Sequence, residues 1–239
     1  MTAVFAVLFA AMTSADAVVT ILNSSNSVSA RVYAEAKRKV AEDAAKKRPL
    51  QQFVHGIYAD DPAVAKKCLD ESRPLIRAMA ERYDNPLAWY LLSMEKNDFT
   101  LLKRAADGGN VQALNAIGTI ATTQAFATKG LSTNQVDAIL RKSFDYFNKA
   151  AAQRDANAFI NLGTCYQRGL GCRQDLANAF VCFMSAAEMG HPEGMDYVSA
   201  CYQFGHGTER DDDLSLLWRM RAKALRGDKN AAEWLRSRK

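Results

Sequence analysis

The sequence feature that most constrains the fold is an internal repeat of 36 residues. Residues 147–171 align without a gap on residues 183–207. The matched positions are Phe147 with Phe183, Ala150-Ala151 with Ala186-Ala187, Cys165-Tyr166 with Cys201-Tyr202, Gly169 with Gly205, Gly171 with Gly207 and, just beyond, Asp175 with Asp211. A period of this length is typical of chains that stack small, similar units.

Each unit has the residue pattern of two helices joined by a glycine-containing loop. Ala158, Leu162 and Tyr166 recur at every fourth residue, which forms one apolar stripe of an α-helix. Gly169 and Gly171 follow, and glycine readily adopts the left-handed backbone that a helix C-cap and a tight loop require. The pattern therefore predicts a first helix that ends in a tight turn.

The second helix is predicted to begin after Asp175, whose carboxylate can accept hydrogen bonds from the free N–H groups of a helix N-terminus. Its small residues Ala179 and Ala186-Ala187 leave room for the next unit, and Gly190 ends it. Gly163, on the first helix, has no side chain and lets a neighbouring helix approach closely. One such helix pair cannot bury its own apolar face, so several pairs must stack.

The same frame extends in both directions with changes in unit length. Upstream, the spacing grows to 45 residues, which indicates an insertion of nine residues near Thr122–Thr133. Further upstream, a unit of only 25 residues has its inter-helix loop reduced to Lys96-Asn97-Asp98. We count about four units. Before them we expect a charged helix over residues 30–47 and one or two helices over residues 62–83, broken near Pro74.

Residues 158–190 resemble the Sel1-like repeat family, a relative of the tetratricopeptide repeats. The matching residues are Ala158, Leu162, Gly163, Tyr166, Gly169, Gly171, Asp175, Ala179, Phe183, Ala186, Ala187 and Gly190. The next unit keeps Tyr202, Gly205, Gly207 and Asp211, but has Gly194, Ser199 and Ser215 at three family positions. The resemblance covers residues 75–235 and implies an all-α, right-handed α-solenoid of stacked antiparallel helix pairs. It also implies protein–protein interaction as the function.

The N-terminus indicates where the protein acts. Residues 3–12 are almost all apolar and precede Ala15-Asp16-Ala17, which is typical of a secretory signal peptide and too short to span a bilayer. No Lys or Arg precedes the apolar stretch, a departure from the usual pattern. We expect a periplasmic or secreted protein cleaved after Ala17, and a cytoplasmic one if residues 1–17 are retained.

Four segments follow from these patterns. Residues 1–17 are the possible signal peptide, and residues 18–29 are a polar tether. Residues 30–74 hold the N-terminal charged and capping helices. Residues 75–239 hold the repeat solenoid, which ends in a basic C-terminal cap.

Charge is concentrated at two places. Residues 31–48 carry seven Lys and Arg against three Asp and Glu, and residues 219–239 carry eight against two. Such basic segments could contact an anionic surface. Neither is interleaved with aromatic side chains that could stack on bases, so we expect exposed helix faces and no nucleic-acid partner.

The histidines give little sign of catalysis. None of His55, His191 and His206 has a serine or cysteine at a spacing that indicates a nucleophile and its base. His191 suits a structural turn or cap, and the acidic run Glu209–Asp213 suits a helix N-terminus. The cysteines lack the spacing of a zinc site. We expect no catalytic residue, no metal and no cofactor.

Two interpretations of the cysteines stay open. Some secreted members of the family carry cysteine pairs that link the two helices of a unit, and a Cys165–Cys182 bridge would do the same here. Alternatively, Cys182 is a small buried apolar residue at a position where the next unit has Trp218. Cys165 and Cys201 occupy equivalent repeat positions, which places them too far apart for a disulfide.

Partner-binding residues are expected on the first helices, off the apolar stripe. These positions are Asn161, Thr164 and Arg168 in one unit, Tyr197, Ala200 and Phe204 in the next, and Ala116, Thr119 and Thr123 in the preceding one. Tyr, Phe and Arg side chains often anchor interfaces. We therefore expect a groove lined by Asn161, Thr164, Arg168, Tyr197 and Phe204 to bind a peptide or protein segment. The alternative is that Tyr197 and Phe204 pack against a neighbouring unit.

The resemblance to the Sel1-like repeat family implies a non-enzymatic adaptor or scaffold. Two other functions compete with it. One is a cell-wall or peptide hydrolase with a cysteine nucleophile near His191 or His206. The other is a regulator that contacts anionic surfaces through its basic ends.

Overall fold

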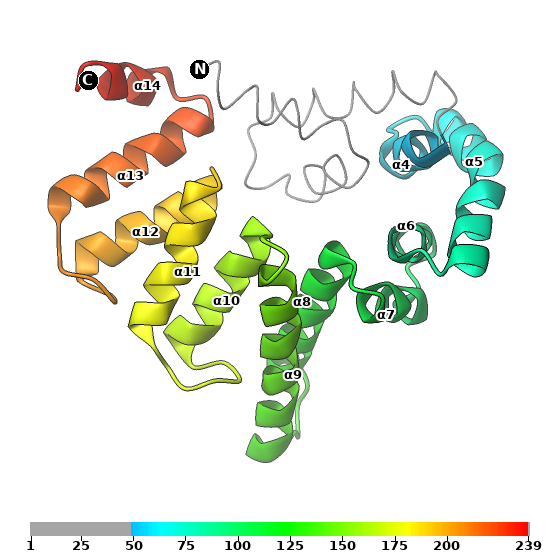
Figure 1. Ribbon diagram of the computed structural model, residues 1–239, viewed down its shortest axis with the longest axis horizontal. Coiled ribbons are helices and arrows are strands. Elements are labelled where there is room, and N and C mark those ends of the chain that lie inside the picture. The colour runs from blue at the N-terminus through cyan, green and yellow to red at the C-terminus, as the bar shows by residue number, and fades with distance from the viewer. Residues whose placement is uncertain (1–48, 239) are drawn as a thin grey trace. The chain divides into compact units, whose positions relative to one another are not determined.

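The computed structural model describes residues 49–238, and these residues form eleven helices and no strand (Figure 1). Consecutive helices pack against each other in pairs, which confirms the predicted all-α fold of stacked helix pairs. The helices are α4 (Pro49–Tyr58), α5 (Pro62–Tyr83), α6 (Pro86–Lys96), α7 (Phe99–Asp107), α8 (Val111–Ala127), α9 (Thr133–Ala151), α10 (Ala156–Arg168), α11 (Leu176–Glu188), α12 (Pro192–Phe204), α13 (Asp212–Leu225) and α14 (Lys229–Arg236).

The chain divides into two compact units after Ala113. The described part of the first unit holds α4 to α7, and the second holds most of α8 and all of α9 to α14. The predicted signal peptide, the polar tether and the charged helix over residues 30–47 lie outside the described residues.

Pro74 lies inside α5, so the predicted break near this residue is wrong. The helix runs from Pro62 to Tyr83, across the predicted boundary between residues 74 and 75. Proline removes one backbone hydrogen bond from a helix. Here Ser72, Ile76 and Ala80 are almost completely buried along one face of α5, and this packing stabilises the helix on both sides of the proline.

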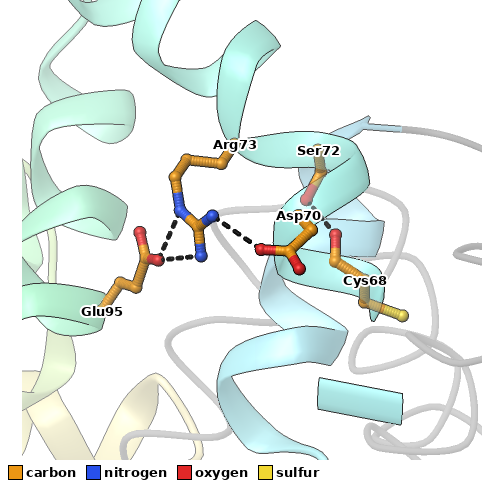
Figure 2. A network of polar contacts seen from close by, with 5 residues as sticks. All are labelled: Cys68, Asp70, Ser72, Arg73 and Glu95. Carbon is orange, nitrogen blue, oxygen red and sulfur yellow. Dashed lines mark hydrogen bonds and ion pairs between the residues drawn. The ribbon is translucent and has the colours of Figure 1, made fainter. Parts of the chain in front are cut away.

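Arg73, next to the proline, connects α5 to α6. Its Nε donates to Oε1 of Glu95 on α6 at 2.7 Å, and its Nη1 donates to Asp70 at 2.9 Å (Figure 2). The Ser72 hydroxyl donates to the Cys68 carbonyl one turn earlier. Because the Glu95 side chain is only 12% exposed, this ion pair is less weakened by water than a surface pair. It holds the α4–α5 pair against the α6–α7 pair.

The predicted insertion takes the form of longer helices. The loop between α8 and α9 covers only residues 128–132. α8 has 17 residues and α9 has 19, whereas α10 and α11 have 13 each. The short unit upstream is also as predicted, with α6 ending at Lys96 and α7 beginning at Phe99.

Close approach of the two helices in a unit depends on a glycine beneath an aromatic ring. A Cβ atom on Gly163 of α10 would lie 2.6 Å from the ring of Phe183 on α11. The same holds one unit earlier, where a Cβ on Gly118 of α8 would lie 2.6 Å from the ring of Phe147 on α9. The predicted role of Gly163 is therefore confirmed.

The loop glycines fix each unit to the one before it. Gly171 has φ +73°, and a Cβ there would lie 2.2 Å from the carbonyl oxygen of Leu140 on α9. Gly207 has φ +76°, and its Cβ would lie 2.0 Å from the carbonyl oxygen of Leu176 on α11. At both positions the backbone of the loop packs directly on the backbone of the preceding second helix, which leaves no room for a side chain.

The predicted helix caps are confirmed at both ends of the loop. Gly169 and Gly205 end α10 and α12 in the left-handed conformation, with φ of 69° and 70°. Asp175 caps α11 by accepting from the backbone N–H of Asn178 at 2.9 Å, and Asp211 caps α13 in the same way. These glycine and aspartate positions recur with the 36-residue period.

Candidate functional site

Three equivalent positions on the first helices are exposed and carry different side chains. They are Thr123 on α8, Arg168 on α10 and Phe204 on α12, and we call them the rim positions. Phe204 is 62% exposed, which is unusual for a phenylalanine. Its ring lies 5.7 Å from that of His206, which is also exposed. The rim positions thus present an alcohol, a cation and an aromatic ring to the solvent.

Asn161 takes part in a polar network that links α8 to α10. The side-chain amide of Asn115 on α8 donates to Oδ1 of Asp155 at 2.7 Å, and the same oxygen accepts from the backbone N–H of Ala158 at 2.8 Å. The Asn161 amide donates to the Asn115 side chain at 3.5 Å. Burial raises the pKa of the Asp155 carboxyl, while the hydrogen bonds from Ala158 and Asn115 oppose that rise.

Sequence reasoning missed Asn115 and Asp155. The cap could have been found, because Asn110 and Ala113 stand at the equivalent positions of the preceding unit and make the equivalent hydrogen bond. No pattern pointed to Asn115, whose partner is 40 residues away.

Tyr197 and Thr164 are half-buried. The Tyr197 ring is stacked on the ring of Phe183, with centroids 4.4 Å apart and planes 8° apart. Tyr197 therefore packs α12 against α11, as the alternative interpretation held, whereas Phe204 remains exposed. The Thr164 hydroxyl donates to the carbonyl of Ile160 on its own helix.

A cavity of about 570 Å³ lies beside the loop between α10 and α11. Its walls include the rings of Phe144 on α9 and Tyr166 on α10, which meet edge to face with centroids 5.4 Å apart. The loop residues Cys172, Arg173, Gln174 and Asp175 complete the lining. The sequence did not single out this site, although the aromatic pair recurs 36 residues later as Phe180 and Tyr202.

All five cysteines lie in the described residues, and each is a free thiol, so the Cys165–Cys182 bridge is not formed. Burial raises the pKa of Cys165 to about 12 and the pKa values of Cys182 and Cys201 to about 11. Cys182 is 8% exposed, which confirms that it is a buried residue. These thiols stay protonated at neutral pH, the opposite of what a cysteine nucleophile requires.

The histidines occupy three different environments. His191 stands at the N-cap of α12, where its side chain makes no capping hydrogen bond, and burial, helped by the nearby charge of Arg226, lowers its pKa to about 4. His206 is exposed at the end of α12. His55 Nδ1 lies 3.6 Å from Sγ of Cys68, but burial and the charge of Glu71 raise the pKa of this thiol too. The His55–Cys68 contact is not the predicted cysteine near His191 or His206, and the raised pKa of the Cys68 thiol is unsuited to a nucleophile.

Residues 49–238 contain no sign of a metal centre or a membrane span. No three His, Cys, Asp or Glu side chains in this range are grouped so that they could hold a metal ion. None of its helices combines the length and the apolar character needed to cross a membrane.

The chain matches the Sel1 repeat family three times, over residues 133–155, 157–191 and 192–218. The matched segments lie within the second compact unit and run from the start of α9 to residue 218 in α13. The match therefore covers the part of the chain in which the glycine and aspartate positions recur most regularly.

Two curated relatives align with part of the chain. The rat protein named DAP3-binding cell death enhancer 1 is 32% identical over 103 residues, which is 43% of this chain and 18% of the relative. An uncharacterised Sel1-like repeat-containing protein of Schizosaccharomyces pombe is 31% identical over 78 residues, which is 33% of this chain and 12% of the relative. The chain thus spans less than a fifth of the length of either relative.

Among solved structures, the fold is similar to that of c5321, a protective antigen of uropathogenic Escherichia coli strains that displays the Sel1-like repeat fold. The TM-score is 0.54, the sequence identity is 19%, and the alignment covers 81% of this chain and 44% of the antigen. At this identity the likeness concerns the fold alone. Together with the three repeat matches, it shows that residues 133–218 of this chain carry Sel1 repeats in a Sel1-like repeat fold.

Proposed function

We propose that this protein is a non-enzymatic adaptor that binds a peptide or protein segment along the first helices of its second unit, α8, α10 and α12. The binding residues are the rim positions Thr123, Arg168 and Phe204, together with Asn161 between them. Tyr197 is stacked on Phe183 and so packs α12 against α11.

The proposal rests on the contrast between the rim positions and the frame that carries them. The three rim positions are equivalent in the repeat and all exposed, yet each holds a different type of side chain. The helix caps around them recur, with Gly169 and Gly205 ending the first helices and Asp175 and Asp211 capping the second helices. A constant scaffold with variable exposed positions is the way repeat proteins obtain a specific extended binding surface. An exposed phenylalanine and an arginine are also residue types that anchor interfaces.

Alanine substitution tests this face. The triple variant Asn161→Ala, Arg168→Ala, Phe204→Ala and the wild type are used as baits in an extract of the native host, and co-purifying proteins are quantified by mass spectrometry. The matched control is Val181→Ala, which removes a 59% exposed apolar side chain from α11, a second helix. We expect the triple variant to lose the main partner and the control to keep it. Retention of that partner by the triple variant would rule the face out.

We further propose that the protein acts outside the cytoplasm, in the periplasm or after secretion. The support is the apolar stretch before Ala15-Asp16-Ala17, since a signal peptide has this arrangement. Intact-mass analysis of the protein from its native host tests the idea. A mature chain that begins at Val18 is expected, and a chain that retains residues 1–17 in the cytoplasmic fraction would contradict it.

The hydrolase alternative receives no support from the thiols. A cysteine nucleophile needs a lowered pKa, whereas burial raises the pKa of each of the five cysteines. Slow reaction of every cysteine with iodoacetamide at neutral pH is expected, and a single fast-reacting cysteine would reopen this alternative.

A further inference from the structure

None of the rim positions lines the cavity beside the α10–α11 loop, which lies where this helix pair meets α9 of the preceding pair. Its walls come from α9, from α10 and from loop residues 172–175. Figure 1 shows this loop running alongside α9, and the contact of Gly171 with the Leu140 carbonyl fixes it there. The cavity volume of about 570 Å³ falls within the range of pockets that bind small ligands or single side chains.

An equivalent site lies where the α12–α13 loop meets α11 and α12, and we call the two sites the first and the second corner. Both corners contain the same aromatic pair and the same backbone hydrogen bond. Phe180 and Tyr202 meet with centroids 5.4 Å apart and planes at 82°, against 5.4 Å and 85° for Phe144 and Tyr166. The backbone N–H of Asp175 donates to the Tyr166 carbonyl at 2.9 Å, and the corresponding bond in the next unit has the same length. The two corners can therefore be compared residue by residue.

The two corners carry opposite charge. Arg173 of the first corner corresponds to Glu209 of the second. The second corner also contains the ion pair of Arg210 with Asp212, the cap Asp211 and the further carboxylate Asp213, so it is acidic overall. Near the first corner, Arg141 of α9 adds a second exposed cation, because Gly171 packs against the backbone of residues 140–141. The Asp175 carboxylate in this corner is already engaged as the cap of α11, where it accepts from the backbone and the side-chain amide of Asn178. Asp175 remains ionised, so the two cations Arg173 and Arg141 exceed the one carboxylate and leave the first corner with a net positive charge.

From this combination we infer that the cavity formed by Phe144, Tyr166 and the 172–175 loop binds a partner segment in which an aromatic side chain stands next to an acidic one. The aromatic side chain packs against the rings of Phe144 and Tyr166, which favour edge-to-face neighbours. The carboxylate pairs with the Arg173 guanidinium, which can bind it through two parallel N–H groups. The acidic corner at Glu209 does not accept the same segment, because like charges repel.

Cys172 provides a reporter for occupancy. It lines the cavity and is half-buried, so a bound segment covers its thiol. Cys68 on α5 is a matched control, because it is also half-buried and burial raises the pKa of both thiols. Cys68 belongs to the first compact unit and lies outside the proposed site.

The test uses the full chain and three fluorescein-labelled octapeptides that differ only in their central pair, Phe-Glu, Phe-Lys or Ala-Glu. Fluorescence anisotropy measures binding, and mass mapping after iodoacetamide treatment measures protection of each cysteine. We expect the Phe-Glu peptide to bind about tenfold more tightly than the Ala-Glu peptide, from the burial of the ring. We expect it to bind about fivefold more tightly than the Phe-Lys peptide, from the charge reversal. It should protect Cys172 and leave Cys68 unprotected.

Two variants separate this site from the adaptor face. Arg173→Glu, an exposed substitution that copies the next unit, should remove the preference for Phe-Glu over Phe-Lys. The Asn161, Arg168, Phe204 triple alanine variant should keep it, so that failure of one site leaves the other testable. Equal binding of the three peptides, a preference for Phe-Glu over Phe-Lys that survives Arg173→Glu, or loss of Phe-Glu binding in the triple variant would each overturn the inference. So would unprotected Cys172 in the presence of saturating Phe-Glu peptide.

Discussion

The α10–α11 pair and the α12–α13 pair share one frame but fill their interiors with different chemistry. In the first pair, Gly163 lies beneath the ring of Phe183. In the second, the equivalent residues are Ser199 and Arg219, and the helices are joined by the buried Ser199 hydroxyl, which donates to the Ser215 carbonyl at 2.8 Å. Ring-over-glycine packing and a buried serine pair thus produce the same helix pair.

The preceding pair, α8 and α9, has both a ring-over-glycine contact and a buried serine hydrogen bond. Gly118 lies beneath the ring of Phe147, as in the α10–α11 pair. The hydroxyl of Ser143, which corresponds to Ser215, donates to the Gly118 carbonyl at 2.6 Å. This is again a buried serine hydrogen bond between the two helices of a pair. Caps and loop glycines therefore determine the frame, whereas the interior contact can change from unit to unit.

The largest effect should come from the part that the two pairs share. We expect Gly171→Ala and Gly207→Ala each to lower the free energy of unfolding by about 4 kcal/mol or more, because the new methyl group meets an immovable backbone carbonyl. Gly190→Ala is the control, since Gly190 has φ +83° but a Cβ there would have no other atom within 4 Å. It should cost about 1–2 kcal/mol from the left-handed backbone alone. Urea unfolding measures all three, and equal losses at Gly171 and Gly190 would show that the loop contact is unimportant.

The next largest effects on stability should come from the contacts that differ between the α10–α11 pair and the α12–α13 pair. Gly163→Ala should cost about 2–3 kcal/mol, because the Phe183 ring has to move. Ser199→Ala should cost about 1–2 kcal/mol through loss of a buried hydrogen bond. Adding Phe183→Leu to Gly163→Ala should recover part of the loss by making room. A double variant whose cost is the sum of the two single costs would contradict the ring-over-glycine contact.

A third prediction concerns the caps, where the two pairs also differ. Asp155 caps α10 through its side chain, whereas His191 stands at the same position of α12 and makes no such bond. His191→Asn should add a cap worth about 1 kcal/mol at neutral pH. A shift in thermal midpoint near pH 7 measures it, and a destabilised variant would show that the imidazole contributes more through packing than a cap does.

The same residue predicts a pH dependence. The pKa of His191 is about 4 in the folded protein, below its ordinary value of 6.5, so the unfolded chain binds the proton first. The contribution of neutral His191 to the free energy of unfolding is complete above pH 6.5 and is lost as the pH falls toward 4, by on the order of 3 kcal/mol. Asp155 acts in the opposite direction, because its raised pKa favours the folded state at lower pH. Asp155 is present in both wild type and His191→Asn, so its contribution cancels when the free energies of unfolding of the two proteins are subtracted. If this difference stays constant between pH 4 and 7, the prediction is contradicted.

The smallest effect on stability is expected at the rim positions. Arg168→Ala and Phe204→Ala should each change the free energy of unfolding by less than about 0.5 kcal/mol, because both side chains are exposed. Tyr197→Ala, at a half-buried position stacked on Phe183, should cost about 2–3 kcal/mol. A large loss at Phe204 would show that this residue packs, as Tyr197 does.

Local signals in the sequence were enough to predict the frame. Glycines at 169 and 205 and aspartates at 175 and 211 act on their own helix ends, so their roles can be inferred from neighbouring residues. Contacts between distant residues could not be predicted in this way. Tyr197 and Phe204 stand on the same helix at predicted surface positions, and only the location of the Phe183 ring separates the packed residue from the exposed one. Pro74 was misjudged for the same reason, because burial of Ser72 and Ile76 outweighs a local preference.

Partner binding by the first helices of the second unit can be tested by site-specific photocrosslinking in the native host. A photoreactive phenylalanine analogue is placed at residue 168, at residue 204 or at residue 181 on α11. We expect crosslinks to the same partner protein from residues 168 and 204, and none from residue 181. Crosslinks from residue 181 alone, or to unrelated proteins from residues 168 and 204, would contradict the proposed binding face.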